Sequence, residues 1–299
     1  CESAVVDGFP EVSACRAMIE RAAQLLRGQT LPDLLASLVA PDDVVGIKVN
    51  TLAGFELATN LEVVDALIEG LLEAGVPASN IVVWDRFEHH LISCLYEIQR
   101  SEGGVRCYGG ESDGAVDLDP DVFYASELGD GEPSYLYRVA TQDVTKIINV
   151  PVPKDHNCSG VTGCLKNIAF GAVNNTVRFH GAPHYCDPMI GEICALPALR
   201  DKVVLHVMDA LRALCDGGPT VGNPERIFEP RELWLATDPV AADTVALDMI
   251  NAEREASGLP PIGEAGPSPK HIETAEALGL GVSAPGASSI AYADISSEV

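Results

Sequence analysis

Basic residues are scarce in this sequence. It contains 19 lysines and arginines against 44 aspartates and glutamates, which gives a formal charge of −25 at pH 7. Nucleic acids and anionic membranes both require a cationic protein surface, so this balance argues against either as a partner. Solubility, or a salt-rich or extracellular setting, is the simplest explanation of the acidic excess.

Long apolar runs are also lacking. No stretch approaches the roughly 18 to 20 residues that cross a bilayer, so we predict no membrane span. The first residues, "CESAVVDGFPEV", contain no basic region followed by an apolar one. We therefore expect any export signal to be absent or already removed.

The pair C-x-x-C does not occur, although the chain has nine cysteines. The usual local signature of ferredoxin-type iron–sulfur clusters, zinc ribbons and thioredoxin chemistry is thus missing. We expect most of these cysteines to be small buried apolar residues, with disulfides left open. Cys1, the first residue of the sequence, is a candidate free thiol.

What the sequence does contain is an alternation of helical patterns and short apolar strands. This alternation predicts a single α/β domain over residues 1–299, with a mainly parallel sheet and helices on both faces. A Gly- and Asp-rich segment at about 101–140 is expected to be an insertion or small subdomain. The predicted elements are helix 12–27, strand 42–50, helix 59–75, strand 80–85, strand 145–151, strand 202–209, and a strand and helix within 232–250.

Polar residues follow the predicted strands. In open parallel sheets the ligand crevice lies beyond the carboxyl ends of the strands, so we expect these residues along one edge. Asp238 has a second interpretation, since it suits the N-cap of a helix that begins at Pro239. The residues concerned are Asn50, Asp85, His156, Asp209 and Asp238.

Residues 151–186 concentrate reactive groups: three of the nine cysteines and three of the seven histidines fall there. Lys166 lies in the apolar helix pattern "TGCLKNIAFG", and a buried lysine needs a partner or a shifted pKa. We predict that Lys166 and His156 are catalytic and that His180 lies close to them. Asp209 is the other candidate general base. The alternative is that Lys166 is a solvated surface lysine.

The segment "HGAPHYC" suggests a metal site. His180, His184 and Cys186 form H-x3-H-x-C in what Gly181 and Pro183 make a loop. Imidazole and thiolate ligands suit zinc, iron, nickel or copper, which the sequence does not distinguish. The alternative is a set of unrelated polar loop residues.

The turn "NCSGVTGCLKN" precedes a predicted helix and suggests an anion or cofactor site. Its backbone N–H groups could bind an anion at the helix N-terminus, although the spacing is not that of a Walker loop. The alternative is an ordinary tight turn. The predicted cofactor-binding residues are Lys154, Ser159, Gly160, Thr162, Gly163 and Asn167.

Several segments together resemble the family of domain of unknown function 362: "VPVPKDHNCSGVTGCLKNIAFGAVNNTVRFHG", "VGIKVNTLAG", "HYCDPMIGEICALPALRDKV", "DALRALCDGGP" and "ATDPVAAD". The resemblance covers about residues 40 to 250. It implies a periplasmic or extracellular protein associated with iron–sulfur redox partners, although this chain contains no iron–sulfur motif. Without export the protein would be cytoplasmic.

A weaker resemblance, in the order of His156, Lys166 and His180 alone, is to lactate-racemase-type enzymes. In those enzymes a lysine flanked by histidines holds a nickel-containing nucleotide.

The residues and the resemblances together predict a metal- or cofactor-dependent enzyme of redox or isomerase type. It would act on a small molecule at the strand-end crevice. The alternatives are an exported, non-catalytic metal- or anion-binding protein and a subunit of a larger assembly.

Overall fold

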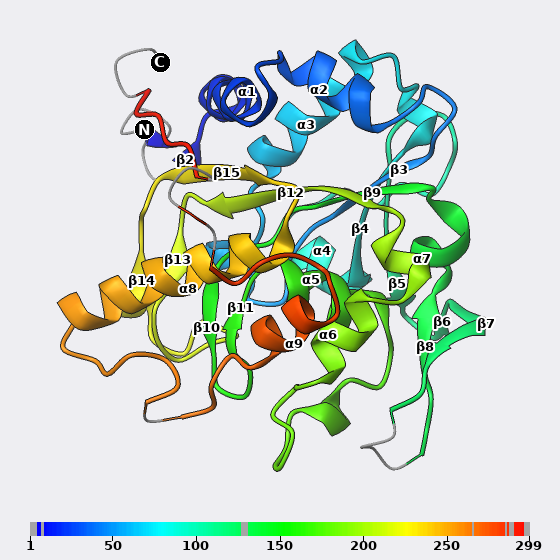
Figure 1. Ribbon diagram of the computed structural model, residues 1–299. Coiled ribbons are helices and arrows are strands. Elements are labelled where there is room, and N and C mark those ends of the chain that lie inside the picture. Colours follow the sequence, from blue (N-terminus) through cyan, green and yellow to red (C-terminus); the bar gives the residue numbers. More distant parts are fainter. Residues whose placement is uncertain are drawn as a thin grey trace.

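A seven-stranded sheet runs through the middle of the molecule (Figure 1). The computed structural model describes residues 5–6, 9–126, 131–264, 266–284, 286 and 290–295. The strands in their order across the sheet are β15 (Glu232–Ala236), β12 (Val203–Ala210), β9 (Lys146–Asn149), β3 (Val45–Lys48), β4 (Ile81–Phe87), β5 (Arg106–Ser112) and β6 (Ala115–Val116).

The five central strands, from β12 to β5, are parallel to one another. Only the edge strands β15 and β6 run antiparallel. β3 is buried along its whole length and β4 over its first five residues, as expected for strands covered by helices on both faces. The mainly parallel α/β fold predicted from the sequence is therefore confirmed.

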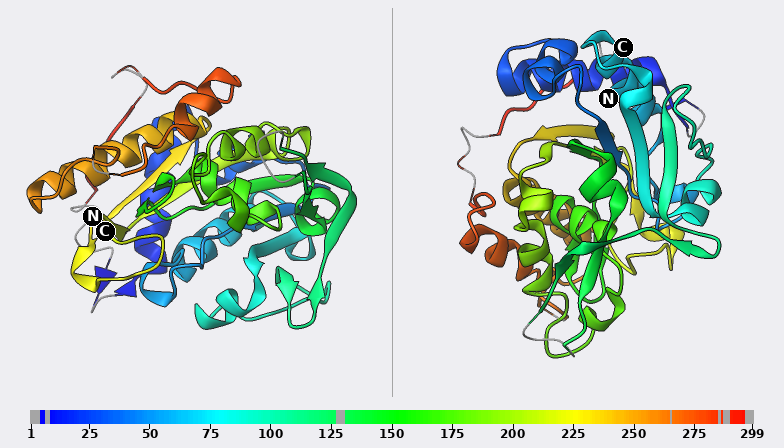
Figure 2. Two further views of the ribbon diagram at one scale, coloured as in Figure 1. Left: turned by 90° about the horizontal axis from the view of Figure 1, so that it is seen from below. Right: turned by 90° about the vertical axis from the view of Figure 1, so that its right-hand side faces the viewer.

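Helices cover both faces of this sheet, as the side view in Figure 2 shows. The layer coloured blue to cyan contains α1 (Val12–Arg27), α2 (Leu31–Leu38) and α3 (Leu61–Glu73). The opposite layer contains α5 (Cys164–Ala172), α6 (Met189–Cys194), α8 (Pro239–Ala256) and α9 (His271–Ala277). Two short helices, α4 (Glu88–Ser93) and α7 (Pro197–Arg200), lie in the connections between strands.

Smaller elements complete the chain. A four-stranded sheet lies beside α5 in the order β11 (Gly160–Thr162), β10 (Lys154–His156), β13 (Ala213–Leu214) and β14 (Ile227–Phe228). Two two-stranded ribbons are formed by β1 (Val5–Val6) with β2 (Phe9–Pro10) and by β7 (Leu118–Tyr124) with β8 (Ser134–Tyr137). Single turns of helix are η2 (Phe55–Leu57), η3 (Ala78–Asn80), η4 (Val139–Asp143), η5 (Val177–Phe179) and η6 (Pro224–Arg226).

The Gly- and Asp-rich segment 101–140 is only partly an insertion. Its first strand, β5, pairs in parallel with β4 and so extends the main sheet. The β7–β8 ribbon then projects from that end of the sheet (Figure 1). The composition of the segment reflects its turns, while the apolar Cys107 and Tyr108 within β5 are buried in the core.

The prediction that five polar residues share one edge is wrong for Asp238. β15 pairs antiparallel with β12, with Ala236 opposite His206 and Glu232 opposite Ala210. Asp238 therefore lies at the opposite end of the sheet from Asp209. Its second interpretation is confirmed, because its side chain accepts a hydrogen bond from the N–H of Ala241 and caps α8.

The cysteines of the described residues agree with the expectation from the sequence. All eight are free thiols, and all are buried except the partly exposed Cys158. Cys1 lies outside the described residues. Within those residues, none of the helices combines the length and apolar character that a bilayer span requires.

Candidate functional site

A buried ion pair joins two neighbouring strands at the carboxyl edge of the sheet. Lys48, at the end of β3, donates to Asp85 in β4 over 2.7 Å and to the carbonyl of Val49 over 2.6 Å. The other oxygen of Asp85 accepts from the N–H and hydroxyl of Thr51. Lys48 holds the pKa of Asp85 below its ordinary value against the opposing effect of burial. Lys48 was not predicted from the sequence, because a lysine inside an apolar strand pattern gives no sign of its partner.

Asparagines extend this network to α5. The Oδ1 of Asn167 accepts from Lys48 over 3.2 Å and from Asn50 over 2.9 Å. Its Nδ2 donates to Asn149 over 2.8 Å. Asn167, predicted to bind a cofactor, therefore ties its helix to the ends of two strands. The residue that precedes it, Lys166, is fixed in place as a result.

Lys154 is a second buried lysine and belongs to the same network. Its Nζ donates to the Oδ1 of Asn50 over 2.6 Å and to the carbonyl of Leu57 over 3.4 Å. Burial lowers its pKa to about 7, and the charge of Lys166 lowers it in the same direction.

Lys166 is buried, with 6% of its surface exposed, so the surface-lysine alternative is wrong. Its ammonium lies 4.9 Å from the centre of the Phe170 ring. Among the described residues it makes no hydrogen bond or ion pair, and neither Asp155 nor Asp209 is its partner. Burial lowers the pKa of Lys166 to about 8. The ammonium is therefore mostly charged at pH 7, and no carboxylate of the described residues is its counterion.

His156 and His180 converge on Lys166 as predicted. The two imidazole centres are 5.5 Å apart, and His180 lies 5.4 Å from the ring of Phe170, over which Lys166 also sits. The convergence follows from β10 carrying His156 next to α5, with the turn after α5 returning His180 to the same place.

The two histidines are held in opposite tautomers. Nδ1 of His156 accepts from the backbone N–H groups of Cys158 and Ser159 over 3.0 and 3.1 Å, so its Nε2 carries the proton. Nδ1 of His180 lies 3.0 Å from the carbonyl of Thr176 and must donate, so its Nε2 keeps a free lone pair. One ring thus offers a donor and the other an acceptor.

Both imidazoles are neutral at pH 7. Burial lowers the pKa of His156 and of His180, and the nearby charge of Lys166 lowers both further. His180 can consequently accept a proton from a ligand, and His156 can donate a hydrogen bond to one.

A third histidine, His271, lies at the start of α9 and was missed. Only 1% of it is exposed, and its Nε2 has no hydrogen-bond partner among the described residues. Burial lowers its pKa to about 3, with a further contribution from Lys166. No signal in the sequence brought His271 to this site, because α9 reaches it only through tertiary packing.

The N-terminus of α5, predicted to bind an anion, is already occupied by a carboxyl group of the protein itself, that of Asp243, whose pKa burial raises to about 7. The carboxylate of Asp243 accepts from the backbone N–H groups of Cys164 and Leu165. Gly163 leaves the space for that carboxylate, since a Cβ there would overlap it. The prediction of a bound anion at these amides is therefore wrong, because Asp243 occupies them. Asp243 also anchors the helix that carries Lys166.

The other predicted cofactor-binding residues shape the turn between β10 and β11. Ser159 is buried and donates to the carbonyl of Val161. Gly160 has a φ of +77°, and a Cβ there would lie 2.9 Å from the backbone nitrogen of Pro269. Thr162 is buried with a hydroxyl that has no partner among the described residues.

Asp209, predicted to be a general base, holds the start of α3. Its Oδ2 accepts from the backbone N–H and from the side-chain amide of Asn60, both over 2.8 Å. Its Oδ1 accepts from the N–H of Leu211. Burial raises the pKa of Asp209. These bonds give it a structural role, and they explain why it is no partner of Lys166.

The predicted metal ligands do not come together as one set. Within the described part of the chain, no group of three His, Cys, Asp or Glu side chains is arranged to hold a metal ion. Cys186 is fully buried, and burial raises the pKa of its thiol to about 12. His180 offers one free lone pair, so these side chains alone do not fit a metal with three protein ligands.

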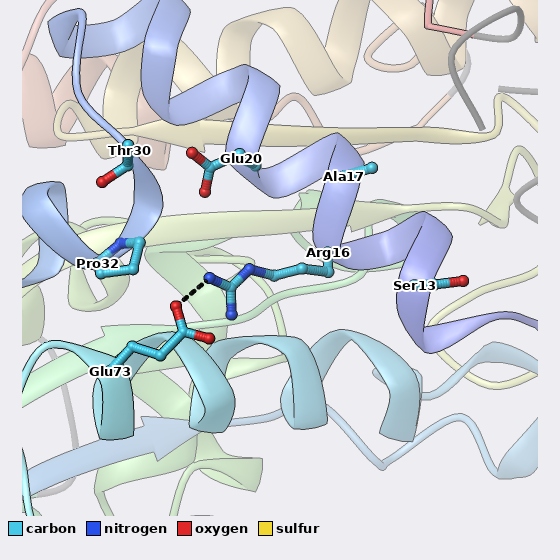
Figure 3. A pocket seen from close by; sticks show the side chains of 7 residues that line it. All are labelled: Ser13, Arg16, Ala17, Glu20, Thr30, Pro32 and Glu73. Atoms are coloured by element: carbon cyan, nitrogen blue, oxygen red, sulfur yellow. Dashed lines mark hydrogen bonds and ion pairs between the residues drawn. The ribbon is translucent and has the colours of Figure 1, made fainter.

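A shallow hollow on the opposite helical layer is unrelated to this chemistry. Figure 3 shows Arg16 of α1 reaching across it to Glu73 of α3, with 2.7 Å between the charged groups. Glu20 accepts from the N–H of Leu31 at its rim. The charged side chains that line this hollow are Arg16 and Glu73, which form a surface ion pair, and Glu20, which accepts from a backbone N–H. The hollow therefore has no buried charge without a partner, unlike the region around Lys166.

The fold and this arrangement define the chain as an α/β protein with a cluster of buried polar groups beyond the carboxyl ends of its parallel strands. The family model described as "Domain of unknown function (DUF362)" matches residues 45–248, and the chain belongs to that family. This confirms the family resemblance found in the sequence. No curated protein is significantly similar in sequence.

A crystal structure of a protein from Thermotoga maritima, a target of a structural genomics consortium, has a TM-score of 0.47 and 14% sequence identity. The match covers 84% of this chain and 60% of that one.

Proposed function

We propose that this chain is an enzyme that moves a proton on a small molecule, with the reaction at Lys166, His156 and His180. The observation that supports this most directly is the pair of neutral histidines of opposite tautomer, 5.5 Å apart, beside an ammonium without a counterion. A neutral acceptor, a donor and a fixed positive charge are the three groups that such a reaction needs.

In this proposal His180 is the general base. Its Nε2 takes a proton from a carbon next to a carbonyl group, and Thr176 stabilises the resulting imidazolium by accepting from Nδ1. The electron pair of the C–H bond moves to the carbonyl oxygen, where Lys166 balances the negative charge. His156, a neutral imidazole, donates a hydrogen bond from Nε2 to that oxygen. The imidazolium of His180 then returns its proton to the other face of the same carbon or to a different carbon, which yields an isomer and regenerates neutral His180.

Burial contributes to this chemistry. Because Lys166 is buried, with 6% of its surface exposed, its ammonium acts more strongly on a developing enolate than it would in open solvent. The lowered pKa of His180 keeps it unprotonated near pH 7, and the pKa of Lys166, about 8, keeps the ammonium charged. We therefore expect an activity optimum between pH 7 and 8.

Solvent hydrogen exchange tests the proposal. The protein is incubated in D2O with a panel of small carbonyl compounds, and loss of the proton next to the carbonyl is followed by NMR. His180→Gln should lower the exchange rate by about 10²–10⁴-fold. The matched control His89→Gln changes an exposed histidine and should leave the rate unaltered. Equal rates in wild type and His180→Gln would remove His180 as the base.

Dependence on a metal ion and export both stay predictions. The metal prediction is supported by the free lone pair of His180, whose ring is oriented by a backbone carbonyl in the manner of metal-binding histidines. Elemental analysis of wild type and of the His180→Ala/Cys186→Ala double variant tests it. Unchanged metal content in the double variant would exclude these ligands.

A further inference from the structure

We infer that Lys166 and His271 together bind an oxyanion group of the substrate, a carboxylate or a phosphate. The inference rests on the proposed function for its choice of site, and it adds the chemical class of the ligand and one residue from the C-terminal helix. It is supported by three observations on the described residues: the charges around Lys166, the packing of α9, and two polar groups that lack partners.

Positive and neutral groups surround Lys166 in a chain with 44 acidic residues. The charges that act most on it and on its three neighbouring histidines come from Lys154, Arg86, these histidines and two thiols, Cys158 and Cys186. No carboxylate is among these groups. A region this short of negative charge favours an anionic ligand.

The thiol and the arginine nearby do not alter this balance. Burial raises the pKa of Cys186 to about 12, so it is a neutral thiol at pH 7 and not a counterion. The charge of Arg86 is already balanced, since Arg86 forms an ion pair with Glu111 over 3.1 Å and also donates to Thr176 over 2.8 Å. The ammonium of Lys166 therefore stays uncompensated.

The packing of α9 brings His271 to the same place. Pro269, two residues before His271, lies against Gly160, and Gly160 is the cross-strand partner of His156. Further along α9, Thr274 donates to Asp187 over 2.6 Å and fixes the helix against the start of α6. Figure 1 shows α9 beside α6 and below β11.

Lys166 and His271 have complementary roles in binding. A buried ammonium and a buried imidazole nitrogen without partners are both costly in the free protein. An oxyanion satisfies both: one oxygen takes the charge of Lys166, and another accepts from the N–H of His271. Neutral His271 adds a directed hydrogen bond without a second positive charge, so Lys166 balances one negative charge of the bound group.

Calorimetric titration with sodium acetate and with inorganic phosphate tests the inference, with sodium chloride at matched ionic strength as the reference. Wild type should bind acetate or phosphate saturably, and whichever binds more tightly identifies the head group. Lys166→Met should weaken that binding by about 100-fold and His271→Phe by about 10-fold. The matched controls Lys146→Met and His89→Phe, remote in the fold or exposed, should bind as wild type does.

The stability of the free variants separates binding from a structural role. Because each change replaces an unpartnered polar group by an apolar one of similar size, the melting temperature should be unchanged or higher. If His271→Phe does not fold, His271→Gln keeps one donor and should still bind more weakly than wild type. Equal anion affinity in wild type, Lys166→Met and the folded His271 variant would overturn the inference. Wild type that binds neither anion more tightly than chloride would also overturn it.

The two proposals fail separately. Anion binding through both residues without proton exchange on any carbonyl compound would keep this subsite and reject the proposed reaction. Proton exchange that depends on His180, together with an anion affinity that is the same in wild type and the His271 variants, would keep the reaction and reject the subsite.

Discussion

Two buried lysines at the carboxyl edge of the sheet differ in their partners. Lys48 uses all of its donors, to Asp85, to Asn167 and to the carbonyl of Val49. Lys166, one residue before Asn167 in the chain, makes no hydrogen bond among the described residues. The first charge joins strands and helix together. The second is held in place by its neighbours and left available, which is what a ligand requires.

The same contrast holds for two buried threonines. Thr59 accepts from the N–H of Asn50 and donates to the carbonyl of Val150. It therefore links the segments that follow β3 and β9 to the loop before α3. The hydroxyl of Thr162 has no partner in the described part of the structure. Thr59 therefore has a structural role at this edge, whereas Thr162, just before α5, keeps a hydroxyl without a partner.

Removing a partner from the satisfied lysine should have the largest effect. Asp85→Ala leaves Lys48 as a buried charge without its carboxylate and should lower the free energy of unfolding by about 3–5 kcal/mol. Urea unfolding measures this, with the exposed Asp113→Ala as the control. A loss near that of the control would mean that the pair contributes little.

The unsatisfied lysine should show itself in the pH dependence of stability. The pKa of Lys166 is about 8 in the folded protein and near 10.5 when exposed. Between these values the unfolded chain binds more protons, so the stability of wild type relative to Lys166→Met should rise with pH, on the order of 1 kcal/mol per unit. Below pH 8 the relative stability should be constant. Urea unfolding of both chains from pH 7 to 10 checks the sign, and a flat difference would contradict it.

Weakening the anchor of α5 should have an intermediate effect. Asp243→Asn keeps the volume but places an amide against two N–H donors, so it should cost about 1–3 kcal/mol. Asp248→Asn changes an exposed aspartate of the same helix and is the control. The variant should also weaken oxyanion binding, because Lys166 follows the anchored residues directly. Normal binding in a destabilised protein would limit Asp243 to a structural role.

The smallest effects should separate the two threonines. Thr59→Val removes two hydrogen bonds and should cost about 1 kcal/mol or more. Thr162→Val removes a hydroxyl without a partner, so stability should stay within about 0.5 kcal/mol of wild type. Thermal unfolding of both variants makes the comparison, and a larger loss for Thr162→Val would show that its hydroxyl is bonded.

Much of the site could be predicted from the sequence because it lies on consecutive elements. His156, Lys166 and His180 come from one strand, the helix after it and the turn that follows. Local periodicity was enough to predict that Lys166 is buried. The functional roles given to Asp209 and to the amides at the N-terminus of α5 were not recovered. Asp209 is bound by Asn60, and Asp243 occupies the amides, so both positions are filled by distant parts of the chain.

The sequence by itself determined the alternation of strands and helices and the burial of a lysine between two histidines, since both depend on patterns within a few dozen residues. It also determined the family, through several segments spread over residues 45–248. The tertiary structure alone decided that β15 runs antiparallel and carries Asp238 to the far end of the sheet. It alone paired Lys48 with Asp85, and it brought His271 of α9 to the Lys166 region. The physical reason is that strand direction and helix docking depend on which distant apolar surfaces pack together, and local periodicity carries no record of that choice.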